Sequence, residues 1–343
     1  MERLTSLDIC RGLAIACMVA ADIPVVTEVG MVKLFSGMLA APFFLFIAGV
    51  SYELFVISRI ERHKNVTVLN IETFWKAMIL LAITQGIFIM GGLLFPSKFS
   101  MEFHSSIFFV IASGYLLSVF LPGRLVYLIP MIILPFLLPY FLDPSMTPVL
   151  FTEPFPLVTY ISYFFAGRAV MIFYENMHDM HMKNERPVIF SALFIAAMVI
   201  IFQVFILPNS GMERTELPGF LLLVGIMIFI LSLLSVSRHR IPGYDFFLSP
   251  FERIGRIAFS VYYAFYALEL VVFPYLNRAF VSNLDPNIQI MAYYLSIIII
   301  LLLTAGIEKI WRKAGYKYGL EWALRYGSAY FMKQTMKVFY VKA

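Results

Sequence analysis

The segment Arg3–Asp22, RLTSLDICRGLAIACMVAAD, decides how the rest of the chain is read. It is apolar enough for a membrane helix, yet beyond Arg3 at its start it carries three charges, Asp8, Arg11 and Asp22, where a plain anchor carries none. At about 100° per residue, Arg11 and Asp22 lie only ~20° apart around a helix, and Asp8 lies about 60° to one side of Arg11. Charge in a hydrocarbon layer is costly unless it faces a bundle interior or a wet cavity. We therefore expect this polar stripe to line a site.

Composition indicates the class of protein. The chain has 343 residues, of which 61% are hydrophobic and 14% charged, whereas soluble domains have about 25% charged residues. This predicts an all-α, polytopic membrane protein. Nothing before the first apolar segment resembles a cleavable signal, so Met1 is expected to begin the mature chain. Cys10 and Cys17 lie about 10 Å apart along one helix, too far for a disulfide.

The hydropathy pattern predicts ten membrane spans, most of about 20 residues, as a bilayer requires. They lie at approximately residues 6–26, 34–58, 73–94, 104–121, 124–142, 156–175, 187–207, 217–236, 257–276 and 287–307. Residues 1–307 are expected to form one transmembrane helical-bundle domain. Residues 308–343 are expected to form a basic, amphipathic cytoplasmic tail.

The distribution of Lys and Arg predicts the orientation. With the amino terminus inside, the outer loops contain only four basic residues, Lys33, Lys98, Arg214 and Arg278. The asymmetry predicts a multi-pass protein of the cell membrane with both termini in the cytoplasm. It also explains the net charge of +5, which argues against a nucleic-acid partner. Aromatic residues between basic ones make the tail typical of a helix lying on anionic lipid; a specific partner for the tail is the alternative.

The basic residues predicted on the inner side could hold the phosphates of a nucleotide cofactor, because Arg binds phosphate through two parallel hydrogen bonds. Arg11, Arg168 and Arg256 are the main candidates, since they lie in or at the edge of spans. Arg124, at the same level, and Asp8, beside Arg11, complete the predicted cofactor site. The alternative for Arg168 is a structural ion pair with an intramembrane acid, either Asp8 or Glu53.

A second group of polar residues is predicted on the outer side. Asp22 ends the first span, Glu28 and Lys33 follow it, and His104 begins the fourth span. A carboxylate and a His at one depth would make a general base with its orienting partner; the alternative is an interfacial His bonded to water or headgroups. Glu269 lies in an aromatic span, and its role is open between a structural ion pair and a contact to substrate.

Other motifs are weak. His178 and His181 have a spacing of three residues, but a stable metal site needs more ligands than Asp179 could add, so no metal is expected. The chain has no Gly-rich phosphate loop, no HExxH motif and no Ser motif with the context of a nucleophile elbow.

Two pairs of segments carry a resemblance. RLTSLDICRGLAIACMVAAD and the segment Ala41–Arg59, APFFLFIAGVSYELFVISR, resemble the first two helices of the heparan-α-glucosaminide N-acetyltransferase type of transmembrane acyltransferase. The segments Ile254–Glu269, IGRIAFSVYYAFYALE, and Tyr316–Arg325, YKYGLEWALR, resemble the end of the related YeiB-like proteins. The match is specific over the first two helices and looser at the carboxyl end.

The resemblance implies a membrane enzyme of ten or eleven helices that moves an acetyl group from cytoplasmic acetyl-CoA to an amino or hydroxyl group of a sugar across the membrane. It places Asp22 where the family has a polar Asn or His after Met18. Lys33 stands where the glucosaminide enzyme has its catalytic His. Either Asp22 therefore acts as the base, with His104 supplied from another helix, or this member has lost the chemistry.

The resulting hypothesis is direct acyl transfer along the stripe of the first helix. The phosphates of acetyl-CoA would bind the inner Arg residues, and the pantetheine would follow the stripe from Arg11 toward Asp22, a helical distance of ~16 Å. Membrane lipids, a glycan-type acceptor and a second copy of the chain are the candidate partners. A transporter or flippase with the same stripe lining its path is the alternative, and a catalytically silent family member is a third.

Overall fold

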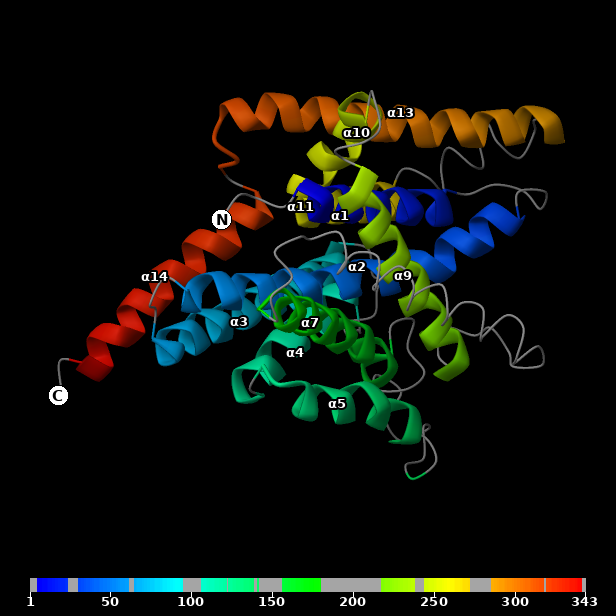
Figure 1. The fold of residues 1–343 in the computed structure, drawn as a ribbon. Helices are drawn as coiled ribbons and strands as arrows, with labels where there is room; N and C mark the ends of the chain where they lie inside the picture. The colour runs from blue at the N-terminus through cyan, green and yellow to red at the C-terminus, as the bar shows by residue number, and fades with distance from the viewer. Residues whose placement is uncertain are drawn as a thin grey trace. The chain divides into compact units, whose positions relative to one another are not determined.

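A computed structural model describes residues 5–23, 30–61, 65–94, 106–121, 123–138, 141, 156–179, 217–237, 244–271, 285–317 and 319–340 (Figure 1). Every element in this part of the chain is a helix, which confirms the predicted all-α class. The helices are α1 (Thr5–Asp22), α2 (Gly30–Ile60), α3 (Val66–Leu94), α4 (Ile107–Phe120), α5 (Leu125–Leu137), α7 (Leu157–Asp179), α9 (Leu217–Ser237), α10 (Tyr244–Arg256), α11 (Ala258–Val271), α13 (Pro286–Lys313) and α14 (Leu320–Tyr340).

Four of these helices are long and apolar enough to cross a membrane, so the chain has the character of a membrane protein. The candidate spans are Ser36–Ile60, Val66–Met90, Leu157–Asn176 and Asn287–Lys313. Three shorter apolar helices coincide with α4, α5 and the centre of α9. The predicted span 187–207 lies outside the described residues.

Helix α10 is an element that hydropathy did not predict. Its sequence, YDFFLSPFERIGR, places apolar residues on one side and charged residues on the other. The mean hydropathy of such a segment is too low to predict a membrane span. In addition, Pro250 lies inside this helix, whereas proline in a sequence usually predicts a helix boundary. Only the amphipathic period could have revealed it.

The contacts divide the chain into two compact units. Unit 1 comprises Leu45–Ile226 and Trp322–Ala343, and unit 2 comprises Glu2–Phe44 and Met227–Glu321. In unit 1, α2 and α7 pack so closely that a Cβ on Gly49 would lie 1.9 Å from the Phe164 carbonyl oxygen. A Cβ on Gly167 would lie 2.0 Å from the Phe46 carbonyl oxygen. The two contacts run in opposite order along the two helices, which are therefore antiparallel.

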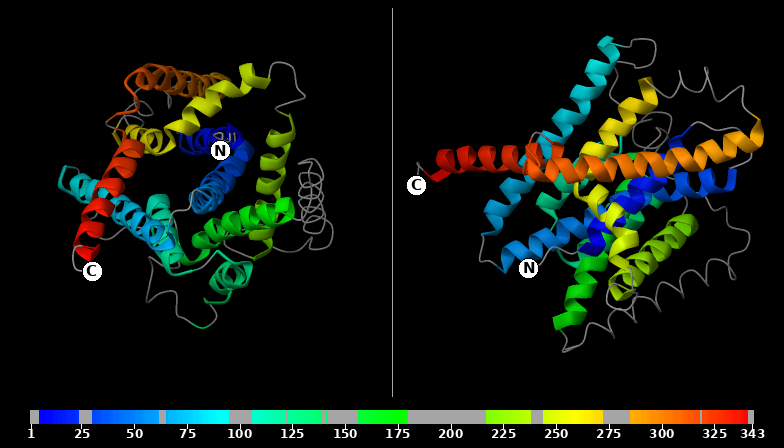
Figure 2. Two further views of the ribbon diagram at one scale, coloured as in Figure 1. Left: turned by 60° about the vertical axis from the view of Figure 1, so that its left-hand side comes forward. Right: turned by 90° about the horizontal axis from the view of Figure 1, so that it is seen from above.

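Unit 2 has the same kind of contact between α1 and α10, which lie side by side in both views of Figure 2. A Cβ on Gly12 would lie 2.0 Å from the Phe251 carbonyl oxygen, and one on Gly255 would lie 1.7 Å from the Asp8 carbonyl oxygen. Helix α1 also contacts α11 and α13. Glycine at the crossing lets the backbones approach and brings the charged residues beside each glycine into one place.

Candidate functional site

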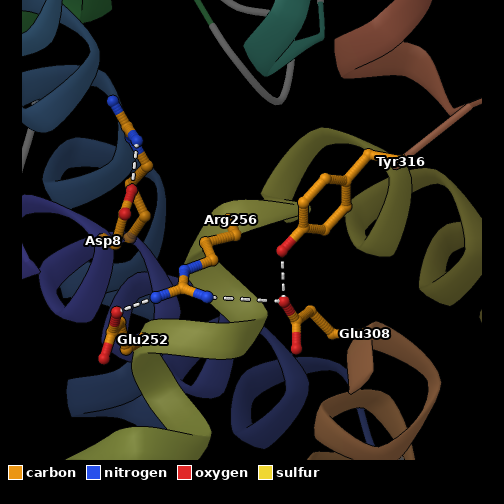
Figure 3. A network of polar contacts seen from close by, with 6 residues as sticks. Asp8, Glu252, Arg256, Glu308 and Tyr316 are labelled. Atoms are coloured by element: carbon orange, nitrogen blue, oxygen red, sulfur yellow. Dashed lines mark hydrogen bonds and ion pairs between the residues drawn. The ribbon is translucent and has the colours of Figure 1, made fainter. Parts of the chain in front are cut away.

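A polar network joins α10, α13 and the turn after α13 (Figure 3). Arg256 ends α10 and is bonded to Glu252 one turn earlier, and its Nη1 lies 3.7 Å from Oε1 of Glu308 on α13. The hydroxyl of Tyr316 donates a hydrogen bond of 2.5 Å to the same Glu308 oxygen. Glu308 is completely buried, whereas Arg256 and Glu252 are about one-fifth exposed. The network therefore reaches from the interior of unit 2 to its surface.

A left-handed turn places Tyr316 in this network. Gly315 has φ +68° and Tyr316 has φ +56°, so the chain reverses immediately after α13. The amides of Gly315 and Tyr316 donate to the carbonyl oxygens of Arg312 and Trp311, at 3.0 and 3.2 Å. This turn satisfies carbonyls at the end of α13. It also directs the phenol back onto its own helix at Glu308.

The pKa of the Tyr316 hydroxyl is raised above its ordinary value of 10.0. Burial of the phenol is the largest cause, because it disfavours the phenolate, and the hydrogen bond to Glu308 acts in the same direction. The folded chain therefore holds this proton more tightly than the unfolded chain does.

Tyr316→Phe is expected to lower the free energy of unfolding by about 1.5 kcal/mol at neutral pH, because it removes one hydrogen bond to a charged group. The raised pKa stabilises the fold below pH about 10, and this contribution is lost as the pH rises through the folded pKa. Thermal unfolding measured against pH should show an alkaline loss in the parent chain that is smaller in Tyr316→Phe. Tyr127→Phe, at an exposed tyrosine, is the control. Parallel curves for parent and Tyr316→Phe above pH about 10 would contradict the assignment.

Asp8 and Arg11 form a second charged pair, near the start of α1 and beside the end of α10. Arg11 Nη1 lies 2.8 Å from Asp8 Oδ1, and the side chains are 29% and 2% exposed. Gly255, the neighbour of Arg256, packs on the Asp8 backbone. The structure thus brings Asp8, Arg11 and Arg256, three of the predicted cofactor residues, to one end of the α1–α10 pair.

The stripe on α1 is closed between its two ends. Asp22, at the far end, is partly exposed. Between Arg11 and Asp22 on the same face, Ile15 is 2% and Met18 is 7% exposed. In this structure buried apolar side chains occupy this face, and the path for the pantetheine arm along it stays a prediction.

Arg168 lies in unit 1, enclosed in the protein. Its Nε donates to Glu53 Oε2 at 2.7 Å, its Nη1 donates to Ser118 Oγ at 2.9 Å, and the guanidinium lies 4.9 Å from the centre of the Tyr52 ring. The side chains of Arg168 and Glu53 are 2% and 3% exposed. Of the two predicted interpretations, the structure shows the ion pair, with Glu53 as the acid.

The structure gives fewer details of the other predicted site residues. Arg124 is exposed and precedes α5 without capping it through its side chain. Lys33 and Glu269 lie in α2 and α11, but their side chains are outside the described part of the chain. Glu28 and His104 lie outside the described residues altogether.

The prediction missed the partners that assemble the site. Glu252, Glu308 and Tyr316 were not identified; an acid in the apolar run of α13 was the available signal for Glu308. A further contact joins the two carboxyl-terminal segments quoted above. The Ser260 amide and hydroxyl donate to the two carboxylate oxygens of Glu321 at 3.1 and 2.5 Å, and the Leu320 amide donates to Ser260 Oγ at 3.0 Å. Each side chain thereby satisfies a donor near the start of the other's helix.

Chemically, the end of the α1–α10 pair offers two partly exposed guanidinium groups, each held by carboxylates, beside a buried acid and a phenol. Such an arrangement can bind an anion at the exposed faces of the guanidinium groups. Asp22 is a carboxylate at the opposite end of the same helix. No family model and no curated protein matches this chain.

Proposed function

We propose that the chain is a membrane-embedded acyltransferase, related to the heparan-α-glucosaminide N-acetyltransferase and YeiB-like proteins that its end segments resemble. It takes an acetyl group from acetyl-CoA at the cytoplasmic side and transfers it to a sugar or similar acceptor on the other side. The observation that carries the proposal is the position of Arg11 and Arg256. Both are partly exposed at one end of the α1–α10 pair, and Asp22 lies at the opposite end of α1.

The proposed topology has ten spans with both termini in the cytoplasm. Contacts between predicted span ends support it. Glu53, Ser118 and Arg168 belong to three different spans, all of which the topology places near the cytoplasmic surface at these residues, and the three side chains meet. At the opposite surface, the Tyr293 hydroxyl donates to the Ala20 carbonyl at 2.6 Å, joining two predicted outer ends.

The donor site in this proposal uses Arg11 and Arg256, both in unit 2, for the phosphates of coenzyme A. Arg124, which belongs to unit 1, stays a prediction from the sequence. Asp8, Glu252 and Glu308 hold the guanidinium groups in place. Arg168 is left out of the donor site, because Glu53 and Ser118 already use its guanidinium inside unit 1.

The chemical step in this proposal is attack by the acceptor hydroxyl or amine on the thioester carbonyl. Asp22, with His104 as the second candidate, removes the proton of the acceptor, the new ester or amide bond forms, and the thiolate of coenzyme A leaves. Glu28, Lys33 and Glu269 are the candidates for contacts to the acceptor. Ile15 and Met18 have to move aside for the pantetheine arm to reach Asp22, since both now fill the face between the two ends.

A transporter or flippase is the second candidate, and the closed face of α1 is the observation that favours it. Alternating access needs a site that opens to one side at a time, whereas transfer across the membrane needs the donor's arm to pass through. Uptake of an amino sugar by proteoliposomes without any acyl donor would favour transport and overturn the acyltransferase proposal.

Asp22→Asn is expected to lower the rate of acetyl transfer by about 10²–10⁴-fold and to leave the affinity for acetyl-CoA nearly unchanged, because it removes a general base and keeps the shape. Transfer to glucosamine is measured with labelled acetyl-CoA on purified protein, and affinity is measured by calorimetry. Asp285→Asn is the matched control, an exposed acid that caps α13, a role that Asn fills equally well.

The calorimetry also tests the donor directly. Absence of heat with millimolar acetyl-CoA and folded protein would contradict the proposal, whatever Asp22→Asn does. Equal losses of transfer and affinity in Asp22→Asn would assign Asp22 to binding or folding instead of proton transfer.

A further inference from the structure

Helix α14 packs one face on α3 within unit 1. The Trp75 ring stacks on Phe331 with centroids 4.7 Å apart, and Trp75 Nε1 donates to Thr335 Oγ1 at 2.9 Å. A Cβ on Gly327 would lie 2.9 Å from Ile79 Cδ1. The face of α14 that contacts α3 is therefore the one that carries Gly327, Phe331 and Thr335.

The opposite face of α14 is exposed and carries two tyrosines followed by two lysines. Tyr326, Tyr330, Lys333 and Lys337 are spaced by four, three and four residues, which keeps them within about 60° of one another around the helix. Tyr326 is 62% and Tyr330 is 51% exposed, and both lysines are exposed. We call these four residues the Tyr–Lys face.

The charge around the Tyr–Lys face has one sign. From Trp322 to Ala343 the sequence contains Arg325, Lys333, Lys337 and Lys342 and no Asp or Glu. The lysines of the face thus have no acidic neighbour on their own helix beyond Glu321 at its start. A partner of negative charge is the complement of this surface.

The contact with α3 indicates the depth at which α14 lies. Trp75 belongs to a candidate span, Val66–Met90, and lies in its first half. Glu72, one turn before, is paired with Lys76 at 3.0 Å and lies 3.9 Å from Arg59. A tryptophan beside a group of charged residues at the end of an apolar helix is typical of the membrane–water interface. Helix α14 crosses α3 at this level.

We propose that the Tyr–Lys face binds the headgroups of anionic phospholipids in the leaflet that α14 adjoins. The lysine ammonium groups contact the phosphates, and the tyrosine rings lie at the level of the headgroups, where amphipathic aromatic side chains are favoured. Anchoring from both sides then holds α14 in place, by Trp75 on α3 and by lipid on the opposite face.

The test uses the full chain in detergent, titrated with phosphatidylglycerol or phosphatidylcholine, and counts retained lipids by native mass spectrometry. Lys333→Gln with Lys337→Gln is expected to weaken phosphatidylglycerol binding on the order of thirty-fold, since each basic residue contributes about 1 kcal/mol near an anionic surface. Lys333→Arg with Lys337→Arg should keep the binding. Lys309→Gln with Arg312→Gln removes the same charge from exposed positions on α13 and is the matched control.

Three results would overturn the proposal. Equal retention of the two lipids by the parent chain would show that headgroup charge is not recognised. Equal weakening of phosphatidylglycerol binding in the α13 control would show that the lipid binds exposed basic residues in general, not the Tyr–Lys face. Full competition by soluble glycerol phosphate would show a site for small phosphates rather than for a lipid surface. Unchanged thermal unfolding of the Gln variant confirms that the Trp75 contact is intact, since both lysines lie on the opposite face.

Discussion

Glu53→Gln is expected to lower the free energy of unfolding by about 3–5 kcal/mol, the cost of breaking a buried ion pair by removing one partner. Arg168 would remain charged inside unit 1, where its side chain is 2% exposed. Among the described residues, Ser118 and the rings of Tyr52 and Phe165 would stay in contact with its guanidinium, and none of them carries a charge. Thermal unfolding of the purified chain, followed by tryptophan fluorescence, measures the loss.

The connection between α4 and α5, which covers Glu53, adds to this cost. A Cβ on Gly123 would lie 2.8 Å from Glu53 Oε1, so the connection between α4 and α5 closes directly over the carboxylate. Water therefore has little room to replace the lost charge partner. The ion pair and its cover form one enclosed unit, and a change in either disturbs both.

Two variants separate the ion pair from general damage. Arg124→Gln removes an exposed arginine from the same unit and should change stability by no more than about 0.5 kcal/mol. Glu53→Leu with Arg168→Met removes both charges together and should recover most of the loss, because no buried charge is left without a partner. An effect of Glu53→Gln no larger than that of Arg124→Gln would contradict the role assigned to the pair.

Helices were predictable where long apolar runs dictate them. The run from Phe43 to Val56 must be helical in lipid, since backbone groups there have no water to bond. Helix α10 was missed because it has apolar residues on one side and charged residues on the other. Their hydropathy values cancel when they are averaged along the sequence. The end of α13 was placed too early, since Glu308 and Lys309 reduce the apolar signal although the helix continues to Lys313.

The charged residues of the candidate site were predictable, but their partners were not. A charge within an apolar helix needs an opposite charge or a cavity, which selects Asp8, Arg11 and Arg168 without stating which helices pack together. Asp8 and Glu53 were equally good partners for Arg168 until the close contact of α2 with α7 was known. Likewise, the helical period places Arg11 and Asp22 on one face, but packing decides whether the residues between them are covered.

Gly12→Ala is expected to lower the free energy of unfolding by more than about 3 kcal/mol or to prevent folding, since it overfills a closely packed crossing. The added Cβ would lie 2.0 Å from the Phe251 carbonyl oxygen, 2.6 Å from the carbonyl carbon and 2.8 Å from the Cα. All three are backbone atoms, so no side-chain rotation relieves the contact. The helices α1 and α10 have to separate, and that displaces Asp8 from the Gly255 crossing next to Arg256.

Glycines at open positions provide the control for the same substitution. A Cβ on Gly306, in α13 of the same unit, or on Gly86, in α3, would meet nothing within 4 Å. Gly306→Ala and Gly86→Ala should therefore be neutral or stabilise the chain by up to about 1 kcal/mol, because alanine favours the helix. Expression level, gel-filtration profile and thermal unfolding compare the three variants. If Gly12→Ala folds with the stability of Gly306→Ala, the close crossing of α1 and α10 is not the native packing, and the shared position of Arg11 and Arg256 loses its basis.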